Sequence, residues 1–304
     1  MSTPVFTPNR PRLLALLSLA LVALLAPLGT HRWQALRPST ATGLHLMAEA
    51  VRRQVELAPV RFWPSFKTAH FIVYYPPSLE GQARIVASAA ESFLPQILAD
   101  YRVPRLSMRV ALVVLTSRAM RADAGTGAAA PPLGFYQDGA VWLLAPDAFL
   151  APGPGLAERY AAQGPAAHEL THLVDDLVSG GRVPAWLDEG LAQYEDWRLT
   201  GYVWLGSQNR FHGPLYSWNQ LTRDFVQLPN QALAYRQALA ATAAVCRKGP
   251  QTCLGLLERL RTGVSTTAAL RSILGAAALG HLEAGGAWQA GSGPRPEGLA
   301  GPVP

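Results

Sequence analysis

Apolar residues form short continuous runs in the first half of this chain and recur at helical spacing in the second half. The runs at 71–75, 109–115 and 140–145 are rich in Val, Leu and aromatic residues, and they predict three strands. Between the first two runs, the spacing predicts a helix over 81–101. The Gly-, Ala- and Pro-rich stretch 124–132 predicts a loop.

Helical patterns dominate after residue 155. Gly164-Pro165 and Ser179-Gly-Gly are start and stop signals for a helix over 165–179, and Pro184 opens another helix over 184–199. Further helices are expected at 156–162, 231–245, 251–261 and 266–273. The intervening stretch 201–229 is rich in Tyr, Trp and Gly with weak periodicity, which predicts a long irregular connection over a cleft.

These elements predict an α+β fold with a small N-terminal sheet and a mostly helical C-terminal part. The 304 residues are 49% hydrophobic and 15% charged, as expected of a globular core. We expect one domain over 63–283. A linker with a helix near 43–56 precedes it at 29–62, and a Gly/Pro-rich tail without fold follows at 284–304.

The N-terminus carries an export or anchoring signal. A short basic segment, 1–12, precedes an uncharged run at 13–28 that would be roughly 24 Å long as a helix. This length lies between that of a signal peptide and that of a short membrane anchor. We therefore expect the predicted domain to be either anchored to a membrane outside the cytoplasm or exported.

The formal net charge of +6 raises the question of a nucleic-acid partner. The arginines are scattered, and no basic run is interleaved with aromatic residues. We therefore expect no nucleic-acid partner.

The candidate chemistry lies in the predicted helix at 165–179. His168, Glu169 and His172 form the pattern H-E-x-x-H. Two histidines four residues apart lie on one helix face, where both imidazoles can bind one Zn²⁺ and the intervening glutamate can face the open position of the metal. The pattern predicts a hydrolytic zinc site.

The predicted helix at 184–199 offers a third ligand. Catalytic zinc takes three protein ligands and leaves the fourth position to water, and two histidines with one glutamate are a recurring set. Asp188 and Glu189 are the candidates, and only one can face the metal because neighbouring helical side chains diverge by about 100°. The other carboxylate would stabilise the helix N-terminus.

The segments HELTH at 168–172 and PAWLDEGLAQY at 184–194 resemble those of gluzincin zinc metallopeptidases, in particular the peptidase MA-like domains. Weaker similarity extends over about 65–282. The resemblance implies a zincin-like fold, a Zn²⁺ cofactor, Glu189 as the third ligand and Glu169 as general base. It also implies that an exposed edge strand before the zinc helix, here 140–145, holds an extended peptide.

Two roles stay open between several residues. Gln193 stands where thermolysin-like enzymes have an aspartate that orients a zinc histidine, so Asp175 or Asp176 is an alternative orienting residue. Tyr235 is the candidate donor to the oxyanion of the tetrahedral intermediate, as the resemblance implies. The rival candidates in the long connection are Tyr202, His212 and Tyr216.

Cys246 and Cys253 lie between two predicted helices. Their spacing excludes a CxxC zinc knuckle, and an exported location permits a disulfide, which we predict here.

Together these patterns predict a zinc-dependent peptidase that acts on a peptide or protein substrate. The alternative is a catalytically inactive, membrane-anchored envelope protein that retains the fold as a binding or assembly module.

Overall fold

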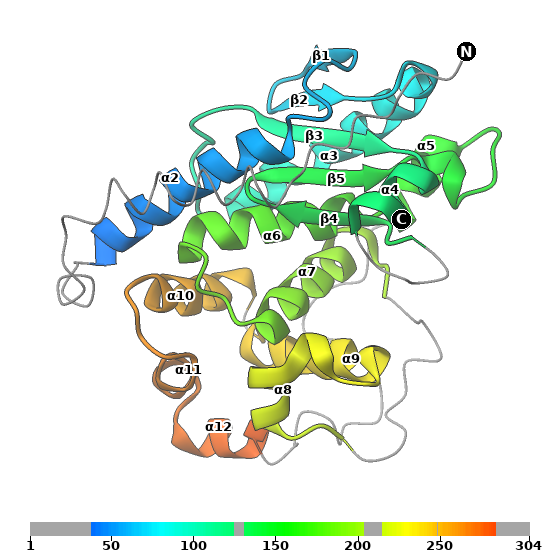
Figure 1. The fold of residues 1–304 in the computed structure, drawn as a ribbon. Helices are drawn as coiled ribbons and strands as arrows, with labels where there is room; N and C mark the ends of the chain where they lie inside the picture. The colour runs from blue at the N-terminus through cyan, green and yellow to red at the C-terminus, as the bar shows by residue number, and fades with distance from the viewer. Residues whose placement is uncertain (1–37, 125–130, 204–214, 248, 284–304) are drawn as a thin grey trace.

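The computed structural model describes residues 38–124, 131–203, 215–247 and 249–283 (Figure 1). The predicted N-terminal segments at 1–12 and 13–28, the first part of the linker at 29–37, and the tail at 284–304 lie outside these ranges. Within the described ranges, none of the helices combines the length and the apolar character needed to cross a membrane.

A five-stranded mixed sheet forms the first layer of the fold. Its strands are β1 (Ser65–Lys67), β2 (Phe71–Tyr74), β3 (Val110–Leu115), β4 (Gly134–Gln137) and β5 (Ala140–Leu144). Their order in the sheet is β1-β2-β3-β5-β4, in which β2, β3 and β5 are parallel and the two outer strands are antiparallel to their neighbours. The three predicted strands are confirmed to within one residue, while β1 and β4 are additional.

The continuous apolar runs of β3 and β5 arise because both faces of the sheet are covered. Leu112 and Val114 belong to the larger core on one face, whereas Val113 and Trp142 belong to a smaller core on the other. Strands buried on both faces lose the alternation of apolar and polar residues, and so they appear in the sequence as unbroken apolar runs.

The expected position of the edge strand was wrong. β5, predicted as the exposed edge, pairs with both β3 and β4 and is fully buried. The edge is β4, which joins β5 through a two-residue turn of Asp138 and Gly139, both at positive φ. An Asp-Gly pair in this conformation is the preferred connection of a tight hairpin.

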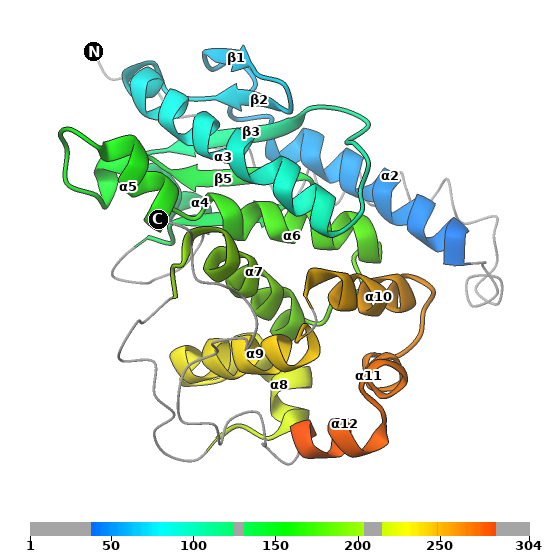
Figure 2. The same ribbon diagram turned by 180° about the vertical axis from the view of Figure 1, so that it is seen from behind.

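Helices cover the sheet and continue beyond it (Figures 1 and 2). They are α2 (Pro38–Glu56), α3 (Glu80–Asp100), α4 (Ser117–Ala124), α5 (Leu156–Gln163), α6 (Ala166–Ser179), α7 (Ala185–Thr200), α8 (Trp218–Asp224), α9 (Gln231–Val245), α10 (Pro250–Arg261), α11 (Thr266–Leu274) and α12 (Ala276–Glu283). Seven of the predicted helices are confirmed to within one residue. The helix expected near 43–56 begins earlier, at Pro38, and α4, α8 and α12 are additional.

The stretch 201–229 is less irregular than predicted, because α8 and a 3-10 turn at Phe225–Gln227 occupy much of its described part. Residues 204–214 lie outside the description. Ser217 caps α8 by accepting a hydrogen bond from the backbone N–H of Gln220, whose side chain accepts one from the Ser217 N–H. This capping box explains why a helix forms despite weak apolar periodicity.

Helix α6 is central to the fold. It lies between α3 and α7, and α7 packs on α9 in turn. Pro165 precedes α6, and Gly180 ends it with φ of 66°. The disulfide between Cys246 and Cys253, predicted from the sequence, joins the end of α9 to α10. The structure therefore holds the two candidate site helices, α6 and α7, between the sheet and the C-terminal helices.

Candidate metal centre

His168 and His172 lie one turn apart on the face of α6 that is turned toward α7. Their imidazole ring centroids are 4.9 Å apart. Leu170 and Val174 on the same helix are fully buried in the main core. This burial fixes the rotation of α6 and so directs both histidines toward α7.

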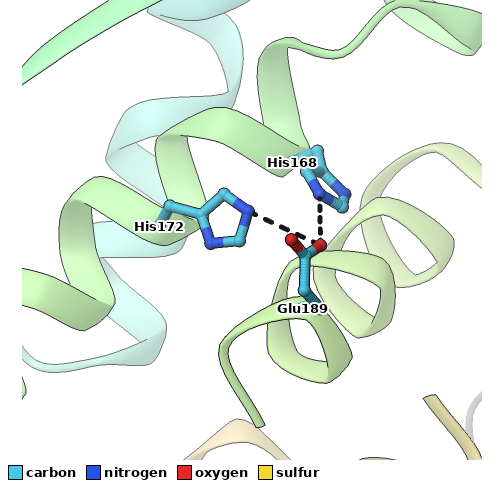
Figure 3. A group of neighbouring side chains, drawn as sticks. All are labelled: His168, His172 and Glu189. Carbon is cyan, nitrogen blue, oxygen red and sulfur yellow. Dashed lines mark ion pairs between the residues drawn. The ribbon is translucent and has the colours of Figure 1, made fainter. Parts of the chain in front are cut away.

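Glu189 meets the two histidines from the second turn of α7, as Figure 3 shows. Its Oε2 lies 3.3 Å from Nε2 of His168 and 3.9 Å from Nε2 of His172. One donor atom from each residue lies within 4.8 Å of the others. Of the two candidate carboxylates on this helix, Glu189 is therefore the one that faces both imidazoles through their Nε2 atoms.

The other nitrogen of each imidazole faces an aspartate of α7. Nδ1 of His168 is hydrogen-bonded to Oδ2 of Asp196 at 3.2 Å, and Nδ1 of His172 lies 3.0 Å from Oδ1 of Asp188. Carboxylates in these positions fix the orientation of a ligating imidazole. Sequence reasoning missed Asp196, and it considered Asp188 as a rival third ligand or as a charge at the helix N-terminus but not as a partner of His172.

The residues expected to orient the histidines lie elsewhere. Asp175 is fully buried, and neither of its carboxylate oxygens has a hydrogen-bond partner in the described structure. Asp176 contacts His45 instead. The amide of Gln193 donates to the backbone carbonyls of Glu189 and Tyr235, so it joins α7 to α9.

Glu169 is buried beside the edge strand. A Cβ atom on Gly134 of β4 would lie 2.8 Å from Cγ of Glu169 and 3.0 Å from its Oε1, so only a residue without a side chain fits there. Burial raises the pKa of Glu169 to about 7, although the two nearby histidines favour its charged form. A carboxylate with a pKa near neutrality suits general acid–base chemistry.

Tyr235 of α9 also lies at the site. Its hydroxyl donates a hydrogen bond to Oε1 of Glu189 at 2.9 Å. Of the rival residues, Tyr216 accepts a hydrogen bond from the backbone N–H of Asn230, and Tyr202 is an exposed residue just beyond α7. His212 lies outside the described residues.

The charges at the site suit a divalent cation. Burial lowers the pKa of His168, but Asp196 and Glu189 outweigh this effect and raise it well above the usual value for histidine. The pKa of His172 is likewise raised, to about 9, because Asp188 and Glu189 outweigh burial. Within the described part of the chain, Oε2 of Glu189 is buried without a hydrogen-bond partner. A metal ion bound at Nε2 of both histidines and at this oxygen would supply the positive charge that these carboxylates favour.

The chain matches no known family model and shows significant similarity to no curated protein. The functional argument therefore depends on the geometry of the site and on the sequence motifs.

Proposed function

We propose that this protein is a zinc-dependent peptidase of the gluzincin type. The observation that carries the proposal is the convergence of Nε2 of His168, Nε2 of His172 and Oε2 of Glu189, with the buried carboxylate of Glu169 adjacent to His168 on α6. Two histidines and one glutamate are a recurring ligand set of catalytic zinc. The order of sheet, H-E-x-x-H helix and glutamate helix also supports a zincin-like fold.

The ligand set fits Zn²⁺ because two neutral imidazoles and one carboxylate leave a net positive centre. Zn²⁺ held by these residues would lower the pKa of a water molecule toward neutrality and polarise the scissile carbonyl. Asp196 is hydrogen-bonded to Nδ1 of His168 and Asp188 lies 3.0 Å from Nδ1 of His172, so in each ring Nε2 is the nitrogen available as a ligand atom.

Glu169 acts as the general base in this proposal. It accepts a proton from the attacking water and passes it to the leaving nitrogen of the peptide bond. Its pKa of about 7 in the metal-free site suits both steps, since the carboxylate must take up and release the same proton near neutral pH.

Tyr235 stabilises the tetrahedral intermediate in this proposal. Its hydroxyl donates to Oε1 of Glu189 in the substrate-free site. A rotation of the phenol would allow the same hydrogen to be donated to the substrate oxyanion. Its pKa, raised mainly by burial and next by Glu189, keeps the phenol protonated and therefore a donor.

We further propose that an extended peptide substrate pairs with β4. This strand ends the sheet and has no neighbouring strand on its outer side among the described residues. Gly134 of β4 lies against Glu169, so a peptide added to this edge would be held close to the general base. The proposal replaces β5, the edge expected from the sequence, with β4.

An extracytoplasmic location belongs to the same proposal. The disulfide between Cys246 and Cys253 supports it, because such bonds persist in oxidising compartments. Attachment through the apolar N-terminal segment remains a prediction from the sequence.

Comparison of the parent protein with Glu169→Gln tests the mechanism. We expect each to bind Zn²⁺ at the centre formed by His168, His172 and Glu189, and only the parent to cleave members of a broad peptide library. Glu158→Gln, which changes an exposed carboxylate on α5, is the matched control and should cleave like the parent. Full hydrolysis by Glu169→Gln would overturn the mechanism. A folded, zinc-loaded parent that cleaves nothing would favour the inactive binding protein.

A further inference from the structure

A second group of metal-ligating side chains lies outside the candidate active site. It consists of His45 and Glu49, which are one turn apart on α2, and Asp176 of α6. One donor atom from each of these three residues lies within 4.8 Å of the others, the same limit that the proposed catalytic ligands meet. The cluster therefore joins two helices through residues that are more than 120 positions apart in sequence.

The side chains of this cluster are already arranged around a common point. Nε2 of His45 lies 2.9 Å from Oδ1 of Asp176. The hydroxyl of Tyr136, on β4, donates to the other oxygen of Asp176 at 2.7 Å and lies 3.3 Å from Oε1 of Glu49. Two ligand atoms that each lie about 2.1 Å from one metal ion are about 3 Å apart. The distance between Nε2 of His45 and Oδ1 of Asp176 is close to this value.

The cluster is enclosed, unlike groups of acidic side chains on open surfaces. The exposed fractions of the side chains are 6% for Glu49, 15% for Asp176 and 27% for His45. Two carboxylates thus share a partly dry site, beside Arg53 at 4.0 Å from Glu49 and His45 at 2.9 Å from Asp176. Two carboxylates held together away from water favour a bound cation, and a divalent metal ion would add two positive charges to the cluster.

Two glycines make room for the cluster. A Cβ atom on Gly139 would lie 2.3 Å from Oε1 of Glu49, and one on Gly181 would lie 2.4 Å from Cε1 of His45. Any side chain at either position would therefore displace a ligand. The backbone approaches both groups closely enough to hold them in place.

We propose that His45, Glu49 and Asp176 bind a second divalent transition-metal cation, of the zinc or manganese class. One imidazole nitrogen and carboxylate oxygens suit these ions. Asp176 follows His172 by one turn, about 6 Å along the axis of α6, and the two sites share no ligand. The second cation therefore has a structural role: it fixes α2 to α6 and, through Tyr136, to the edge strand β4.

The test uses the full-length chain with the substitutions His168→Ala and His172→Ala, which remove the proposed catalytic ligands. This background makes the result independent of the proposed peptidase function. We expect the metal-free protein to bind one molar equivalent of Zn²⁺ or Mn²⁺ in a calorimetric titration. Absence of binding of both ions would overturn the proposal.

Two further substitutions in that background identify the ligands. His45→Ala and the nearly isosteric Glu49→Gln should each lower the affinity at least tenfold. Asp138→Asn is the matched control. It removes the ion pair between Asp138 and Arg52 of α2 but changes none of the proposed ligands. It should bind like the background protein. Unchanged affinity in Glu49→Gln would contradict metal coordination by Glu49. If Asp138→Asn lost as much affinity as Glu49→Gln, the loss would reflect the packing of α2 on the domain and not metal coordination.

Discussion

Nδ1 of His168 is hydrogen-bonded to the carboxylate of Asp196, which lies 28 residues later in the chain. Asp196 follows Glu189 by seven residues, two turns further along α7, and therefore shares its helix face. Helix α7 thus supplies two carboxylates to His168: Glu189 faces Nε2, and Asp196 is hydrogen-bonded to Nδ1 on the opposite side of the ring.

Asp196→Asn should weaken metal binding without removing a ligand. The asparagine can still accept from Nδ1, but it lacks the charge that makes the imidazole a stronger ligand. We expect the affinity for Zn²⁺ to fall about 10- to 100-fold, as measured by competition with a chelator of known affinity. Asp224→Asn, an exposed aspartate of α8, is the control and should bind like the parent. Unchanged affinity in Asp196→Asn would mean that this hydrogen bond does not contribute to the site.

Gly134→Ala should impair catalysis more than stability. The added methyl group would lie 2.8 Å from Cγ of Glu169, so the general base must move. A displacement of about 1 Å in a catalytic group can cost on the order of 100-fold in rate, and we expect at least a tenfold fall in kcat with zinc still bound.

The control for this substitution is Gly81→Ala on α3, where a Cβ atom has open space. Its kcat should equal that of the parent. If Gly134→Ala kept full activity, the position inferred for Glu169 during catalysis would be wrong.

An element could be predicted from the sequence where the residues that determine it lie within or next to that element. The long apolar runs of β3 and β5 and the Gly and Pro signals around α6 are local, and they placed these elements to within one residue. β4 is short and only partly buried, so its hydrophobic pattern is weak. The Asp138-Gly139 pair was nevertheless a recognisable hairpin signal that could have revealed it.

The same reasoning applies to the candidate site. The candidate ligands His168, His172 and Glu189 belong to short motifs, whereas the positions of the carboxylates beside the imidazoles depend on how α6 and α7 cross. Apart from the seven-residue spacing between Glu189 and Asp196, no local pattern distinguishes Asp196 from Asp175. The structure places Asp196 beside an imidazole, whereas Asp175 is buried and has no hydrogen-bond partner among the described residues.

Gly190→Ala should destabilise the fold by separating α7 from α9. A Cβ atom there would lie 2.1 Å from Oγ1 of Thr242 and 2.7 Å from the carbonyl oxygen of Ala238. A backbone carbonyl cannot move aside without shifting its helix, so we expect a loss of about 1–3 kcal/mol in the free energy of unfolding by urea.

Gly280→Ala on α12 is the comparison for this substitution. The Cβ atom has open space there, and alanine favours helix over glycine by roughly 0.5–1 kcal/mol, so stability should stay equal or rise slightly. Equal stability of Gly190→Ala and the parent would contradict the close packing of α7 on α9.

Glu195 should make the stability of the metal-free protein depend on pH. Its side chain is fully buried, and burial raises its pKa from 4.5 to about 7 despite the nearby Arg198. The folded state therefore holds this proton more tightly than the unfolded state does, and stability falls as the pH rises from about 4.5 to 7 and is level above that. The shift corresponds to a loss on the order of 3 kcal/mol.

Glu195→Gln removes this contribution because the amide does not titrate and can still accept a hydrogen bond from Arg198. Urea unfolding at several pH values should show a smaller fall in stability between pH 4.5 and 7 than in the parent, since Glu195 no longer titrates and its charge no longer helps to raise the pKa of Asp175. Glu158→Gln, at an exposed position, should retain the full fall. If Glu195→Gln lost as much stability as the parent over this interval, Glu195 would have to be ionised in the folded protein, and the buried charge would then require compensation from Arg198.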